Sequence, residues 1–151
     1  MALLAGVAYD PATAVTKSTA ALLAMTALDT TNLRLTFTAP SNGAVLVRLV
    51  GTLHGATTFP QIMLGVLDGA TVRGRVAPQA VIGGTALATT MVNVAALVPI
   101  TGLTPGNSYT WDAAYGVETL VASTGLKYGG PNNTTANDAW GAFIFEVWNT
   151  A

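Results

Sequence analysis

Residues 33–52 read LRLTFTAPSNGAVLVRLVGT and decide the fold class. Apolar and polar residues alternate from Leu33 to Phe37, a period of two that is typical of a half-buried strand. The turn residues Pro40–Gly43 follow. In the run that starts at Val45 both faces are largely apolar, which predicts a central strand. Together the two runs predict a β-hairpin.

The same period of two continues toward the end of the chain. Residues 61–67 are followed by Asp68-Gly69, a two-residue hairpin signal, and the return strand is expected at residues 70–76. Residues 17–28 fit a helix or a strand, and we favour a strand because the surrounding sequence is all-β. Further strands are expected at residues 86–98, 109–115, 117–121 and 140–148.

About eight strands separated by turns predict an all-β fold. We expect a single antiparallel two-sheet sandwich of jelly-roll type, or a related Greek-key sandwich. Residues 1–16 are expected to form an extended N-terminal arm, and residues 17–151 the β-sandwich domain. A chain of 151 residues is long enough for one domain with a sizeable core.

Composition excludes several functional classes. The chain has no cysteine, six Lys and Arg, seven Asp and Glu, and a net charge of −1. Nucleic-acid binding needs clustered positive charge, so we expect no nucleic-acid partner. The charge-free stretch from Val76 to Trp111 is interrupted by proline and glycine, so we expect no membrane span. Residues 1–7 have no basic start, and we expect no secretory signal.

The scarcity of charge is the first indication of function. Only 9% of the residues are charged, whereas about 25% is typical of a globular domain. Isolated domains depend on surface charge for solubility. We therefore expect other subunits to cover much of the surface, which favours assembly over catalysis.

Residues with catalytic potential do not form a recognisable motif. His54 is the only histidine, and no neighbouring nucleophile or carboxylate would make it a general base, so we interpret it as a loop residue. Ser41, Ser108 and Ser123 lie in no nucleophile elbow. Among the carboxylates, Asp68 belongs to a turn and Asp29 to a strand entry. Only Asp112 with Glu118 could form an acid/base pair, and ion-pair or rim roles are favoured. For Glu146, within a strand, we expect an arginine partner such as Arg34 or Arg48 if it is buried.

Ligand sites are equally unsupported by the sequence. One histidine without cysteine excludes an ordinary zinc site, and no acidic spacing matches a calcium loop. The sequons at Asn132 and Asn133 are interpreted as loop composition. The sequence also contains a group of aromatic residues that fits either a sugar-stacking platform or a packed core, and we favour the core. They are Tyr109, Trp111, Tyr115, Trp140 and Trp148. We expect no enzyme activity, no metal and no cofactor.

Three segments resemble a known family. They are Leu35–Leu49 (LTFTAPSNGAVLVRL), the turn Gly102–Gly106 (GLTPG) before Tyr109–Trp111, and the closing Phe143–Trp148 (FIFEVW). Together they are similar to small jelly-roll proteins of tailed bacteriophages, especially head decoration (cement) proteins. A more distant similarity is to the trimeric heads of the tumour-necrosis-factor and complement type. The resemblance covers about residues 26–148 and carries over no functional residue.

The resemblance implies a homotrimer on the outside of a phage capsid, made in the host cytoplasm, that stabilises contacts between major capsid protein subunits. The N-terminal arm would then reach the capsid through Leu3, Leu4, Val7, Tyr9 and Pro11. The alternative is a tail-fibre or spike head that recognises a host glycan or protein through loops such as residues 125–138. Fold alone does not decide between them.

Overall fold

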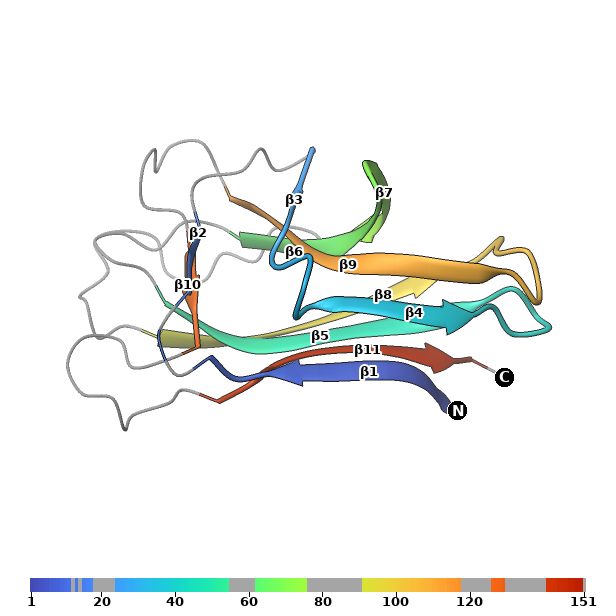
Figure 1. Cartoon of the computed structure of the whole chain (residues 1–151), viewed down its shortest axis with the longest axis horizontal. Coiled ribbons are helices and arrows are strands. Elements are labelled where there is room, and N and C mark those ends of the chain that lie inside the picture. The colour runs from blue at the N-terminus through green and yellow to red at the C-terminus, as the bar shows by residue number, and fades with distance from the viewer. Residues whose placement is uncertain are drawn as a thin grey trace.

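The computed structural model describes residues 1–11, 13, 15–17, 24–54, 62–75, 91–117, 126–129 and 141–150. Within these ranges the chain forms strands joined by turns and bends, and it contains no helix. The strands build two antiparallel sheets that face each other as a sandwich (Figure 1). The predicted all-β, two-sheet sandwich is confirmed.

The first sheet is organised around its longest central strand, β5 (Val45–His54). One side of β5 pairs with β11 over Val45–Val50 and then with β10 at Leu53 and His54, while β8 pairs along the whole of the other side. The predicted central position of this strand is thereby confirmed. The other members of the sheet are β1 (Leu3–Tyr9), β2 (Val15–Lys17), β8 (Met91–Ile100), β10 (Leu126–Tyr128) and β11 (Phe143–Asn149).

The second sheet is organised around β9 (Ser108–Val117). Two strands follow one another along one side of β9, and the other side pairs with a hairpin. The members of this sheet are β3 (Thr26–Ala27), β4 (Arg34–Thr38), β6 (Ile62–Asp68) and β7 (Thr71–Arg75). Eight of the strands have five or more residues, close to the expected number, and β2, β3 and β10 are shorter. The strand order is compatible with a jelly roll, which stays a prediction.

The hairpin predicted from residues 33–52 is wrong. β4 belongs to the second sheet and pairs with β9, whereas β5 belongs to the first. The turn between them crosses from sheet to sheet and is fixed by hydrogen bonds to the turn between β8 and β9: Leu103 N–H donates to the Gly43 carbonyl at 3.0 Å, and Ala39 N–H to the Asn107 carbonyl at 2.9 Å. Turn chemistry is local, so it predicts the bend but not the sheet that each strand joins.

The other hairpin prediction is confirmed. β6 and β7 are antiparallel neighbours, Asp68 pairs with Thr71 at the end of the ladder, and Gly69 and Ala70 form the turn, in which Gly69 has a positive φ. The Asp68 carboxylate also pairs with Arg73, with an N–O distance of 2.6 Å. Of residues 17–28, favoured as a strand, Lys17 ends β2 and Thr26–Ala27 form β3, while 18–23 lie outside the described residues.

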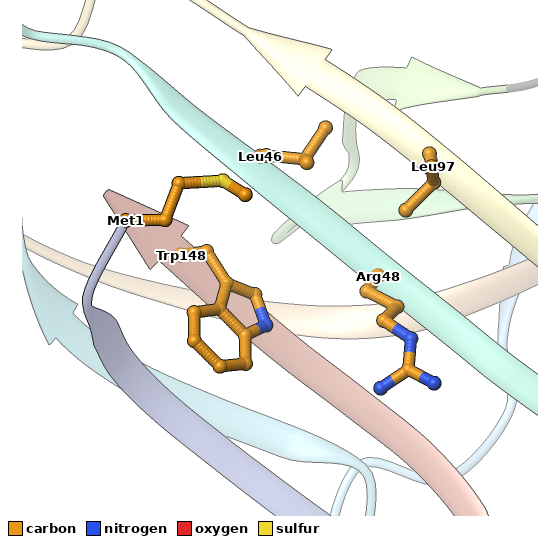
Figure 2. A pocket seen from close by; sticks show the side chains of 5 residues that line it. All are labelled: Met1, Leu46, Arg48, Leu97 and Trp148. Carbon is orange, nitrogen blue, oxygen red and sulfur yellow. The ribbon is translucent and has the colours of Figure 1, made fainter. Parts of the chain in front are cut away.

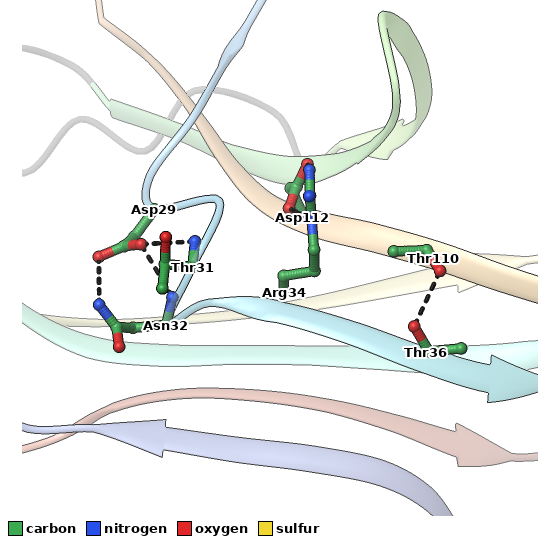
Figure 3. Close-up of polar contacts among 7 residues, drawn as sticks. All are labelled: Asp29, Thr31, Asn32, Arg34, Thr36, Thr110 and Asp112. Atoms are coloured by element: carbon green, nitrogen blue, oxygen red, sulfur yellow. Dashed lines mark hydrogen bonds and ion pairs between the residues drawn. The ribbon is translucent and has the colours of Figure 1, made fainter.

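The turn between β3 and β4 is closed by Asp29 (Figure 3). Its carboxylate accepts the backbone N–H groups of Thr31 and Asn32, each at 2.8 Å, and the Asn32 side-chain amide at 2.9 Å. Partial burial acts to raise the pKa of Asp29, but these hydrogen bonds, with the charge of Lys17, outweigh it and hold the pKa below the ordinary value of 3.8. The turn leads the chain into β4 beside β9.

The core lies between the sheets and is filled by alternate residues of each strand. On the first sheet Val47, Leu49 and Phe145 are fully buried, and on the second Leu64 and Trp111 are. Each β5 residue that points inward is followed by one that points outward, as the pleat requires. The last strand shows the same alternation, because Phe143, Phe145 and Val147 are buried while the residues between them are half-buried.

The expected N-terminal arm is part of the sandwich. Residues 3–9 form β1, which pairs with β11 along its length, and Val15–Thr16 lie in β2 of the same sheet. The separation of residues 1–16 from the domain is therefore incorrect for the described part of this segment. Its small apolar residues suit an edge strand, because they alternate between the core and the surface.

Substitution of Gly43 tests the crossing turn. Gly43 has a φ of +62°, and an added Cβ would collide with the Leu103 carbonyl oxygen, so Gly43→Ala should lower the free energy of unfolding by about 2–4 kcal/mol. Gly102→Ala is the matched control, because φ is also positive there but an added Cβ meets nothing within 4 Å. Its cost should be about 1 kcal/mol. Urea denaturation measures both; equal losses would contradict the crossing-turn contact.

Candidate assembly surface

The first sheet has a charge-poor surface on the side that faces away from the core. We call it the outer face. It carries the outward side chains of β1, β11, β5 and β8: Leu3, Gly6, Ala8, Ile144, Glu146, Trp148, Leu46, Arg48, Val50, Thr52, Asn93, Ala95, Leu97 and Pro99. Only two of these residues are charged. The outer face is apolar because β5 is apolar on both of its faces and β8 lies in the charge-free part of the sequence.

The large hydrophobic residues that are most exposed gather on this side of the sheet. Among the described residues they are Met1, Leu3 and Leu97, which are 80%, 50% and 58% exposed. Met1 immediately precedes β1, and the other two belong to the outer face. Single exposed apolar residues are common on proteins, but a contiguous group on one sheet marks a binding surface.

A shallow hollow lies within this apolar region. Met1, Leu46, Arg48, Leu97 and Trp148 line it, its wall is apolar, and its volume is about 290 Å³. Figure 2 shows that these side chains come from the chain start and from β5, β8 and β11, so the hollow crosses three neighbouring strands. It offers room for apolar groups and no set of convergent polar atoms of the kind that fixes a small substrate.

The two charges of the outer face neutralise each other. Arg48 on β5 and Glu146 on β11 are register partners, with Nη1 of Arg48 3.1 Å from Oε2 of Glu146. The same oxygen accepts a hydrogen bond from the Trp148 indole N–H at 3.0 Å. The expectation that Glu146 pairs with an arginine such as Arg48 is confirmed. The outer face therefore has no net charge to attract an ionic ligand.

The residues predicted to act as arm contacts lie mostly in the sandwich itself. Leu4, Val7 and Tyr9 are half-buried and pack against the core, and Pro11 is buried beside Gly129. Only Leu3 is exposed, and it lies on the outer face. The sequence offered no sign of this arrangement, because the partner of β1 is the last strand of the chain.

The acid pair considered for catalysis is not assembled within the described residues. Asp112 is buried and forms a two-pronged ion pair with Arg34, its register partner, at 2.7 and 2.8 Å (Figure 3). The hydrogen bonds and charge of Asp112 raise the pKa of Arg34. Glu118 lies outside the described residues. The ion-pair role favoured for Asp112 is confirmed.

The aromatic residues are largely internal, as the sequence favoured. Trp111, Tyr115 and Tyr128 are buried, and Tyr109 is half-buried beside Phe37. Burial also raises the pKa of Tyr128. Trp148 is the exception, because it lies half-buried on the outer face.

Several predictions fall on residues that the structure does not describe or describes only in part. His54 was interpreted as a loop residue, which is wrong, because it is the last residue of β5 and lies opposite Lys127. Ser41 lies in a turn, and Ser108 is the first residue of β9. Outside the described residues lie Ser123, Asn132, Asn133, Trp140 and most of the 125–138 loop. In the part of the chain that is described, no three His, Cys, Asp or Glu side chains form a group that could hold a metal. The described residues also include no helix long and apolar enough to cross a membrane.

Comparisons with known proteins leave the family open. No protein-family model, no curated protein and no solved structure matches the chain significantly. The functional argument therefore depends on the residues and on the geometry described above.

A pair of substitutions on β1 tests the placement of this strand. Val7 points into the sandwich and Leu3 onto the outer face, so Val7→Asp should lower the free energy of unfolding by about 2 kcal/mol or more. Leu3→Asp, the control on the same strand, should change it by no more than about 0.5 kcal/mol. Urea denaturation at one protein concentration measures the difference. Equal effects would show that Val7 is not packed against the core.

The Arg34–Asp112 pair makes a second prediction. Arg34→Met should lower the urea midpoint at pH 7, because it leaves the buried Asp112 carboxylate without its cation. The double variant Arg34→Met/Asp112→Asn should recover part of the loss, because no buried charge is then unpaired. A double variant less stable than the single one would show that Asp112 does not depend on Arg34 for its stability.

Proposed function

We propose that this chain is a structural virion protein that binds the outside of a phage capsid as a homotrimer and stabilises contacts between capsid subunits. The observation that carries the proposal is the outer face of the first sheet. It is a largely apolar surface across four strands, its two charges are paired with each other, and the most exposed large hydrophobic residues of the described ranges lie on or beside it. Such a surface is suited to a protein partner.

Composition supports an assembly role independently of the fold. With 9% charged residues, the chain has little charge with which to keep an isolated copy soluble. Interface cores are depleted in charge and enriched in aromatic residues, Met and Arg. The hollow on the outer face has this composition, with Met1, Trp148 and Arg48 side by side.

The phage capsid enters the proposal through the family resemblance alone. The segments that carry it form β4, the crossing turn and β5, the turn that bonds to the crossing turn, and β11. They are therefore parts of the scaffold and not of a site. The proposal includes no catalytic activity, cofactor or metal.

Solution mass and capsid binding test the proposal in turn. At low protein concentration, light scattering on a sizing column should give three times the chain mass of 15.3 kDa. The protein should then sediment with empty shells of the major capsid protein encoded with it. Bound protein should also raise the temperature at which these shells come apart, because a ligand of the intact shell stabilises it. A monomer that neither sediments with the shells nor stabilises them would overturn the proposal.

A further inference from the structure

We propose that the outer face binds the same face of a second copy of this chain, around a twofold axis that runs along the strands between β5 and β11. The inference goes beyond the proposed function, because it names an interface between copies that a threefold assembly does not need. On a capsid, which has both twofold and threefold axes, this contact would join neighbouring trimers. It does not require capsid binding.

The order of side chains across the sheet carries the inference. The strands run in the order β1, β11, β5, β8, so a twofold axis between β11 and β5 places β5 of one copy over β11 of the other, and β8 over β1. Residues in register lie in rows across the four strands. Rotation about this axis keeps each row at the same height along the strands and reverses the order of its residues. A face can therefore pair with itself only if each row is complementary to its own reverse.

The middle row meets this condition by charge and by shape. It consists of Gly6, Glu146, Arg48 and Leu97. Its reversal places Arg48 of each copy over Glu146 of the other. Each of the four charged groups then has groups of opposite charge as its neighbours, both within its own sheet and across the interface. The same reversal places Leu97, a protruding side chain that is 58% exposed, over Gly6, which has no side chain.

The two flanking rows meet the same condition, because the side chains that would face each other fit in size. One row is Ala8, Ile144, Val50 and Ala95, so reversal sets alanine against alanine at the margins and valine against isoleucine between them. The other row is Leu3, Trp148, Leu46 and Pro99, so Leu46 meets the Trp148 ring and Pro99 meets Leu3. The three rows that span all four strands are therefore complementary to their reverses.

The central ion pair favours a second copy over a purely apolar partner. Covering Arg48 and Glu146 with hydrocarbon would remove both from water without any new polar contact, which is costly. A second copy brings its own pair in the opposite order. Its charges then replace part of the lost hydration.

The available area is close to what a stable dimer needs. The four strands are spaced by about 4.8 Å and have a mean length of about 29 Å. The face of each copy therefore covers roughly 550 Å², and the contact would bury ~1,100 Å² in total. Stable interfaces begin at about 1,200 Å². We therefore expect association of moderate affinity, which should depend visibly on protein concentration.

Charge reversal at the middle row is the direct test. Arg48→Glu gives each face two acidic groups and Glu146→Arg gives each face two basic groups, so either variant alone should pair at least about tenfold more weakly than the unaltered chain. An equimolar mixture of the two variants should pair again, because opposite charges then meet. Light scattering and sedimentation velocity over a range of concentrations measure the association.

The control is the exposed ion pair of the β6–β7 hairpin. Arg73→Glu and Asp68→Arg reverse charges of similar exposure on the second sheet and should leave pairing unchanged, alone or mixed. If the wild-type chain shows no concentration-dependent doubling of its mass, the proposal is wrong. It is also wrong if the mixture of Arg48→Glu and Glu146→Arg fails to restore pairing, or if the hairpin variants weaken it equally.

A steric exchange tests the same row without altering charge. Gly6→Leu should block pairing, because two leucines then compete for one space, while an added Cβ at Gly6 meets its own chain no closer than 3.4 Å. Adding Leu97→Ala to Gly6→Leu should restore pairing, since the protrusion and the gap have changed places. A double variant that remains unpaired would overturn the placement of Leu97 over Gly6. None of these results depends on whether the chain binds capsid shells.

Discussion

Burial of one face of β5 against the second sheet is the interaction on which the rest of the structure depends. Val47 and Leu49 of this strand are fully buried, and both of its edges are paired, so it fixes the positions of β8 and β11. The pleat then forces the intervening residues outward. Because Leu46 and Val50 are also apolar, the same strand creates the core and the outer face. The candidate surface is therefore a direct consequence of the strand that organises the fold.

Local pattern predicted the strands but, apart from the β6–β7 hairpin, not their partners. Alternation predicted strands at β4, β9 and β11, the apolar residues on both faces marked β5 as a central strand, and the Asp68-Gly69 signal identified the β6–β7 hairpin. The hairpin expected between β4 and β5 failed, because pairing is decided by β9 and β11, which are distant in the sequence. The turn before Val45 can close a hairpin or cross between sheets, and the residues of the turn alone do not distinguish the two.

A charge-poor surface was predicted, but its position was not. Scarce charge indicated a surface covered by a partner, and Glu146 was expected to pair with an arginine such as Arg48. The contacts were assigned to the N-terminal segment, most of which instead packs against its own core. Only the register across four strands shows that Leu97 and Gly6 share a row, and no local pattern contains that register.

The pairing of β1 with β11 has a consequence for how the protein is made. β1 is synthesised long before β11, its partner in the sheet, so it stays unpaired until the long segment between them and β11 itself have been made. Contacts between residues so far apart in sequence form slowly. During that wait the unpaired, apolar β1 is open to association with other nascent chains. Synthesis slow enough for each chain to finish before it meets another, or the help of a chaperone, should therefore raise the yield of folded protein.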